Sequence, residues 1–232
     1  MKKEKQSKKI VRLILVALVL LVVLVLMTLS VNYKPPVTAE VWNPAMTKGG
    51  DDGRPYIMYT DIACPYCMKF AEAVNSHKSD FNERYIDNGK IRFEIRITDY
   101  LYANGKENSK SGGESAYCAA NQDKFWPYYE ALTHQLYEDY YAKGENAPVL
   151  DTEYYVKIAT KTGVDKDKFV TCMKNHETEE RLTDVTKKAE EAGVAGMPSF
   201  VFNGTSIPSG FGGTWDMDYN YELAKKMKDA QL

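Results

Sequence analysis

One long hydrophobic stretch dominates the N-terminal part of the chain. Residues 10–31 read IVRLILVALVLLVVLVLMTLSV, and the segment from Leu13 to Met27 contains no polar side chain. A helix of this length is long enough to span the ~30 Å hydrocarbon layer of a membrane. We therefore predict a transmembrane anchor over residues 10–31.

The charges around this stretch predict its orientation. Residues 1–9 contain five lysines and one glutamate. Positive flanks stay in the cytoplasm, so we expect a cytoplasmic basic tail, a single-pass anchor in the cell membrane and an extracytoplasmic domain after Val31. A cleaved signal peptide is the alternative, but its apolar core has about 7–15 residues and ends in small residues. The longer core, followed by MTLSVN, favours an uncleaved anchor.

The pattern changes after the anchor. Residues 32–53 are rich in Pro, Gly and Asn without clear periodicity, which predicts a linker. Residues 54–60, RPYIMYT, contain a short continuous apolar run that is typical of a strand buried on both faces. From Cys64 to Ile86 apolar residues recur every three or four positions, and Asn88-Gly89 follows. This spacing predicts an amphipathic helix with a glycine at its C-terminal end.

The next segment alternates strictly. In residues 91–97, IRFEIRI, apolar side chains share one face, and Arg92, Glu94 and Arg96 share the other. We expect a half-solvated strand at or near a sheet edge. Strand, helix and strand in this order form a βαβ unit with parallel strands and a right-handed crossover.

The remaining sequence predicts a helical block and then a second β region. Residues 98–113 are polar and rich in glycine, which predicts a mobile connection, and residues 114–141 predict one or two helices interrupted at Pro127. Three further helices are expected in residues 151–163, 165–175 and 177–193. Residues 199–213 then predict strands around a tight Asn203-Gly204 turn, and residues 216–230 a last helix. The fold class is α/β.

Charge excludes one class of partner. Seven of the 30 Lys and Arg and one of the 32 Asp and Glu precede residue 35, so the rest carries 23 against 31, a net charge of −8. A negative surface repels phosphates, so we expect no nucleic-acid binding. About 180 residues after the linker suit one domain.

The candidate chemistry lies in TDIACPYCMKF, where Cys64 and Cys67 are separated by two residues. A structural zinc site usually needs two close ligand pairs, but Cys118 and Cys172 stand alone and the three histidines show no paired spacing. We therefore predict no metal site. A purely structural bond across so short a loop removes little chain entropy. Redox chemistry of the two thiols remains.

Local context supports that chemistry. If the helix begins near Cys64, backbone N–H groups with partial positive charge surround its sulfur and favour the thiolate, the attacking species. Pro65 suits the first helical position. We predict that Cys64 is the exposed nucleophile and Cys67 the more buried resolving cysteine. Downstream, GVAGMPSF places Pro198 before a strand, where a cis bond is expected and the Met197 backbone is free to pair with an extended substrate.

These motifs together resemble the DsbA-type disulfide oxidoreductases of the thioredoxin fold, in particular their membrane-anchored members. The matching segments are DIACPYC (61–67), KFWPY (124–128), DKFVTC (167–172) and GVAGMPSF (193–200). The resemblance implies a thioredoxin-like core over residues 54–106 and 190–232, with a helical insertion over residues 107–189. It also implies substrate contacts at Pro65, Tyr66, Met197 and Pro198. Tyr66 replaces a common His and Met197 a common Val or Thr, which leaves the strength of oxidation open.

The resemblance further implies a function and partners. The expected reaction is oxidation of thiols in unfolded or reduced exported proteins, with re-oxidation by a quinone-linked membrane protein of the DsbB or VKOR kind and no cofactor. The alternatives are a reductase or isomerase that uses the same pair, and a chaperone-like binding module without redox chemistry. In an oxidising compartment thiols seldom stay unpaired, so we favour a structural Cys118–Cys172 bond over two buried thiols.

Overall fold

The computed structural model describes residues 15–21, 43–76, 82–202 and 204–207. Residues 15–21 form a short exposed helix within a first unit, Met1–Pro35, and the second unit is Pro36–Leu232. In the described part of the chain, no helix combines the length and the apolar character that crossing a bilayer requires. Most of the predicted anchor and the whole predicted C-terminal helix lie outside the described residues.

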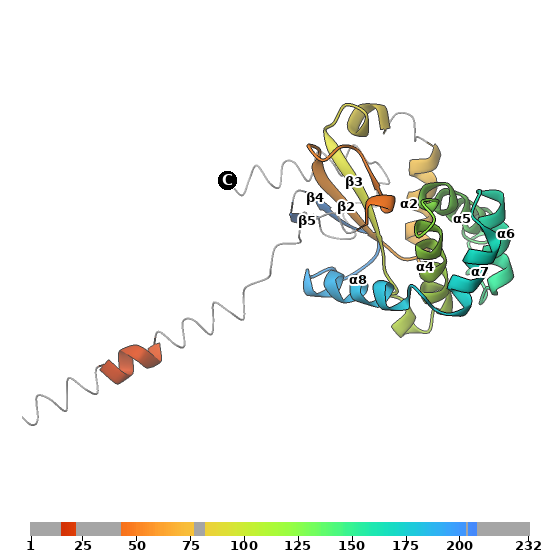
Figure 1. Ribbon diagram of the computed structural model, residues 1–232. Helices are drawn as coiled ribbons and strands as arrows, with labels where there is room; N and C mark the ends of the chain where they lie inside the picture. The colour runs from red at the N-terminus through yellow and green to blue at the C-terminus, as the bar shows by residue number, and fades with distance from the viewer. Residues whose placement is uncertain (1–14, 22–42, 77–81, 203, 208–232) are drawn as a thin grey trace, which may run out of the picture. The chain divides into compact units, whose positions relative to one another are not determined.

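A mixed five-stranded sheet forms the centre of the second unit (Figure 1). Its order is β1 (Thr47–Lys48), β3 (Ile91–Ile97), β2 (Arg54–Thr60), β4 (Ser199–Phe202) and β5 (Thr205–Ile207). β2 and β3 are parallel, which confirms the predicted βαβ unit, and the other neighbouring pairs are antiparallel. β4 and β5 form the predicted hairpin, in which Gly204 has a φ of +84°.

Helices cover the sheet and form the insertion. α2 (Pro65–Ser76) follows β2 and packs against α5 of the insertion. The insertion and its connection contain η3 (Tyr102–Asn104), α4 (Glu107–Ala120), α5 (Phe125–Asp139), η4 (Tyr141–Lys143), α6 (Thr152–Lys161) and α7 (Lys166–Lys174). α8 (Glu179–Glu191) then leads back to the sheet and contacts β3. Figure 1 shows α4 to α7 grouped together beside α2. This arrangement agrees with a thioredoxin-like core interrupted by a helical insertion.

The predicted linker is too long at its C-terminal end. η1 (Pro44–Met46) places the Met46 side chain in the core with 0% exposure. β1 follows directly, and its Thr47 and Lys48 pair with Glu94 and Phe93 of β3. A two-residue strand has no periodicity to detect, so the Pro- and Gly-rich composition concealed it.

Two helix boundaries also differ from the prediction. The helix expected to reach Ile86 is described as α2 up to Ser76, and η2 (Asn82–Ile86) has π-helical rather than α-helical hydrogen bonds. The break between α4 and α5 lies at residues 121–124 rather than at Pro127. Pro127 is in the first turn of α5, where a missing N–H leaves no helical hydrogen bond unmade.

The predicted mobile connection over residues 98–113 is wrong in its second half, because α4 begins at Glu107. Glycine lowers helix propensity, which is why this sequence resembles a loop. The fold needs the glycines for close packing. A Cβ at Gly112 would lie 2.4 Å from Cγ2 of Ile62, and one at Gly113 would lie 2.8 Å from Cδ1 of Leu182.

The half-solvated face predicted for β3 is buried. Glu94 and Arg96 are 2% and 3% exposed, and Arg96 Nε lies 3.1 Å from Glu94 Oε1. Arg96 Nη1 also donates to the Tyr59 hydroxyl at 3.2 Å. Opposite charges on one face of the strand neutralise each other, so this face tolerates burial.

Candidate active site

Cys64 lies directly before the first residue of α2, Pro65, and acts as the N-cap of the helix. Its sulfur accepts a hydrogen bond from the Cys67 backbone N–H, with an N–S distance of 3.3 Å. This is the contact by which an N-cap side chain satisfies a free N–H of the first helical turn. Pro65 occupies the first helical position, where its missing N–H has no cost.

The two cysteines have pKa values shifted in opposite directions. A hydrogen bond from the Cys67 thiol lowers the pKa of Cys64, and backbone N–H groups add to this effect, whereas burial opposes it. Burial raises the pKa of Cys67 well above its ordinary value, and its role as donor to Cys64 raises it further. Cys64 is therefore the more acidic thiol of the pair.

The prediction that Cys64 is exposed is wrong. Cys64 is 4% exposed and Cys67 1% exposed. The Cys64 sulfur points into the helix N-terminus, and its other side faces the Met197 carbonyl, with an Sγ–O distance of 3.4 Å. Tyr66, between the cysteines, is 62% exposed. Pro65, between Cys64 and Tyr66, is half-buried.

A distant loop completes the site. The Met197–Pro198 bond is cis, as the sequence led us to expect, and both residues are half-buried just before β4. The fold thus brings Met197 against Cys64 across 133 residues of chain. The Met197 sulfur lies 3.8 Å from Oγ1 of Thr98, and that hydroxyl donates to the Thr60 carbonyl at the end of β2. Thr98 therefore links the loop to the strand that carries the cysteine motif.

Asp61 is a site residue to which the sequence analysis gave no role. Its carboxylate is 0% exposed and accepts three hydrogen bonds: from Ala63 N at 2.8 Å, Leu101 N at 2.9 Å and Ser109 Oγ at 2.6 Å. Burial raises the pKa of Asp61 to about 6 despite these bonds. When ionised, Asp61 opposes the Cys64 thiolate and raises the pKa of Cys64. Its position three residues before Cys64 was the feature of the sequence that could have indicated a role in the site.

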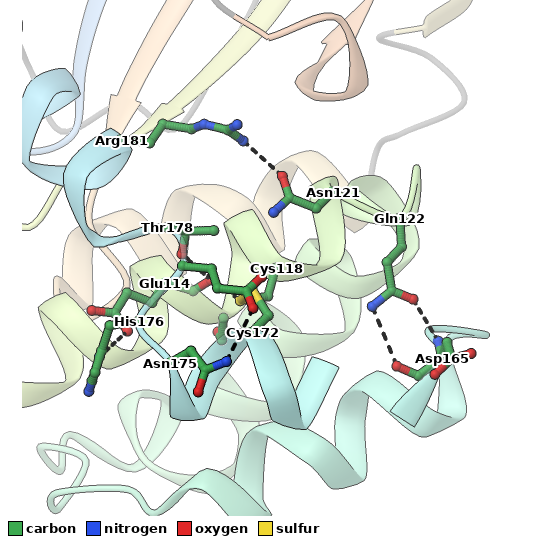
Figure 2. The surroundings of a disulfide bond; sticks show 12 residues. Glu114, Cys118, Asn121, Gln122, Asp165, Cys172, Asn175, His176, Thr178 and Arg181 are labelled. Carbon is green, nitrogen blue, oxygen red and sulfur yellow. Dashed lines mark hydrogen bonds and ion pairs between the residues drawn. A yellow bond between two sulfur atoms is a disulfide. The ribbon is translucent and has the colours of Figure 1, made fainter. Parts of the chain in front are cut away.

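The other two cysteines form a disulfide within the insertion, as Figure 2 shows. Cys118 of α4 and Cys172 of α7 are bonded, with a Cα–Cα distance of 5.9 Å, and both are buried. The bond joins segments 54 residues apart in sequence. Cys64 and Cys67 are both free thiols. The disulfide therefore lies within the insertion, and the free thiols lie at the start of α2.

Comparison of the sequence with protein families places this site in a known context. A family profile described as Thioredoxin matches residues 49–216. The chain belongs to the thioredoxin family. Among curated proteins, none matches it.

Solved structures resemble this thioredoxin-family chain over most of its length. BdbD from Bacillus subtilis has 15% identity and a TM-score of 0.62, and the match covers 78% of this chain and 91% of BdbD. The thiol-disulfide exchange protein α-DsbA2 from Wolbachia pipientis has 17% identity and a TM-score of 0.57, with 78% and 86% coverage. MdbA, a thiol-disulfide oxidoreductase from Actinomyces oris, has 14% identity and a TM-score of 0.56, with 70% and 76% coverage. The chain therefore has the fold of these proteins.

Proposed function

We propose that this chain catalyses thiol–disulfide exchange through Cys64 and Cys67, and that it oxidises cysteine thiols of exported proteins. One observation carries the proposal: the Cys64 sulfur is held at the N-terminus of α2, 3.4 Å from the Met197 carbonyl before cis-Pro198. The N-terminus of α2 stabilises the Cys64 thiolate when it leaves, and the Met197–Pro198 segment offers backbone groups for pairing with an extended substrate.

The reaction begins with the Cys64–Cys67 bond formed. A substrate thiolate attacks Cys64 Sγ, a substrate–Cys64 bond forms, and Cys67 leaves as a thiolate that takes up a proton in its buried position. A second substrate thiolate then attacks the substrate sulfur of this mixed disulfide. The substrate is released with a disulfide, and the enzyme is left with a Cys64 thiolate and a Cys67 thiol.

The direction follows from the stability of the leaving group. Because the N-terminus of α2 and the Cys67 thiol lower the pKa of Cys64, the dithiol form is stabilised and the disulfide becomes oxidising. Equilibration of the full-length protein with glutathione buffers tests this. A potential near about −120 mV, as in DsbA, supports an oxidase, and one near about −270 mV, as in thioredoxin, would instead support the reductase alternative.

A binding module without redox chemistry is separated from the enzyme by Cys64→Ala. We expect this variant to lose disulfide formation in a reduced, unfolded substrate protein. If it oxidised the substrate as fast as the unchanged protein, the redox function would be excluded.

The proposed location and partners are supported by the sequence. The apolar residues 10–31 and the lysines before them support a single-pass anchor in the cell membrane with the cysteine site on the extracytoplasmic side. Substrates there are reduced or unfolded exported proteins. An oxidase must lose two electrons after each turnover, so we include a quinone-linked membrane re-oxidase of the DsbB or VKOR kind as its partner.

A further inference from the structure

A buried carboxylate in the insertion lacks half of its hydrogen bonds. Glu114 of α4 is 2% exposed, and its Oε2 lies 2.9 Å from Nδ1 of His176. In the described part of the chain, its other oxygen, Oε1, has no hydrogen-bond donor. A buried carboxylate oxygen without a hydrogen bond is costly, so Oε1 would gain from a donor or a cation that the described side chains do not place in contact with it.

Two more side chains with metal-ligating atoms converge on Glu114. His176 lies in the turn between α7 and α8, and Glu179 is the first residue of α8. One ligand atom from each of the three residues lies within 4.8 Å of the others. The His176 and Glu179 side chains are 59% and 45% exposed, so both have room to shorten these distances around an ion. Glu114 supplies the fixed, buried ligand.

We propose that Glu114, His176 and Glu179 bind a divalent transition-metal ion of the zinc class. One imidazole nitrogen with two carboxylate oxygens is a ligand set that suits Zn²⁺, and three protein ligands leave one position for water. The ion would give Glu114 Oε1 its missing partner. This site is independent of the Cys64 chemistry.

The ion would fasten the same two segments that the disulfide joins. Glu114 lies one helical turn before Cys118 on α4, and His176 follows Cys172 by four residues (Figure 2). This proposal revises our prediction of no metal site, which rested on the spacing of cysteines and histidines. His176 and Glu114 are 62 residues apart in sequence, so only the fold brings them together.

One neighbouring cation competes for the site. Lys110, one turn before Glu114 on α4, forms an ion pair with Glu179 Oε1. A bound metal must displace this ammonium group. Removing the Lys110 charge should therefore tighten metal binding, whereas removing a ligand should weaken it.

The test titrates ZnCl₂ into full-length protein by calorimetry. Both Cys64→Ser and Cys67→Ser are introduced first, because the thiols of the motif would themselves bind zinc. We expect one Zn²⁺ per chain with a micromolar or tighter Kd. His176→Asn and Glu179→Gln should each weaken binding at least tenfold, and Lys110→Met should tighten it severalfold. Asn suits position 176 because it tolerates the φ of +52° found there.

The chain contains a matched control. His134 also faces a carboxylate, with Nδ1 2.9 Å from Glu72 Oε2, and it is not part of the three-ligand group. His134→Asn should leave the Zn²⁺ affinity unchanged. The proposal is overturned if Zn²⁺ does not bind, if binding survives His176→Asn and Glu179→Gln, or if His134→Asn weakens it equally.

Discussion

In the proposed reaction the charge on the Cys64 sulfur determines the reactivity of the site, and Cys67 influences that charge. The Cys67 thiol is the main cause of the lowered pKa of Cys64. In Cys67→Ala we therefore expect the pKa of Cys64 to rise toward that of free cysteine, ~8.5. The ultraviolet absorbance of the thiolate, followed against pH, measures this midpoint. Tyr66→Ala is the control, since it keeps the hydrogen bonds from the Cys67 thiol and the Cys67 backbone N–H to the Cys64 sulfur. An unchanged midpoint in Cys67→Ala would show that the Cys67 thiol does not lower the pKa of Cys64.

Asp61 should make stability depend on pH. Its pKa is about 6 in the folded chain against 3.8 ordinarily, so its protonated form is favoured by folding. The sign follows: this contribution is fully present below pH ~4 and is lost as the pH rises through about 6, with a cost of about 3 kcal/mol. The free energies of unfolding of the protein and of Asp61→Asn, measured with denaturant, should therefore diverge over this range. As the pH rises, the unchanged protein should lose stability relative to the variant. Parallel curves would show that Asp61 ionises normally.

At the residue scale, the sequence predicted what local spacing determines. Two cysteines around Pro65 at a helix start are sufficient to predict which sulfur lies at the helix N-terminus and has the lowered pKa. The burial of Cys64 and the role of Asp61 depend on distant groups instead. Leu101 and Ser109 lie 40 and 48 residues from Asp61, and Met197 lies 133 from Cys64. A single sequence does not show that residues so far apart along the chain lie in contact.

At the scale of elements, the Cys118–Cys172 bond holds α4 to α7. Closing a loop with a sequence separation of 54 contributes ~4 kcal/mol in the chain-entropy model. We expect Cys118→Ala with Cys172→Ala to lower the free energy of unfolding by about this amount and to leave the glutathione potential of Cys64 unchanged. Denaturant unfolding and the redox titration measure the two effects. A shifted potential would show that the insertion bond influences the active site.

Periodicity predicted the longer elements better than the shorter ones. β2, β3 and the helices after residue 150 have enough residues for their apolar pattern to show. β1 has two residues, and the start of α4 contains glycines that the packing against Ile62 and Leu182 requires. Burial of the Glu94–Arg96 face was equally invisible, because alternation reports two faces of a strand but not what covers them.

At the scale of the whole molecule, lysines are concentrated before the apolar run, and this asymmetry of basic residues predicts topology. The basic residues before the apolar run should hold the N-terminus in the cytoplasm, and the remainder of the chain should be exported. In a bacterial host, we expect the full-length protein to stay with membranes after alkaline extraction. In intact spheroplasts, added protease should digest the domain.

Mass spectrometry of the membrane-bound protein separates an anchor from a signal peptide, because only an anchor leaves residues 1–31 on the mature chain. Replacing the five lysines of residues 1–9 with glutamate should reduce the fraction that protease reaches, since these charges set the orientation. Replacing five acidic residues of the exported part with glutamine is the control for total charge and should not change that fraction. A mature chain that begins after residue 31, or release of the protein by alkali, would refute the anchor and leave an exported protein free of the membrane.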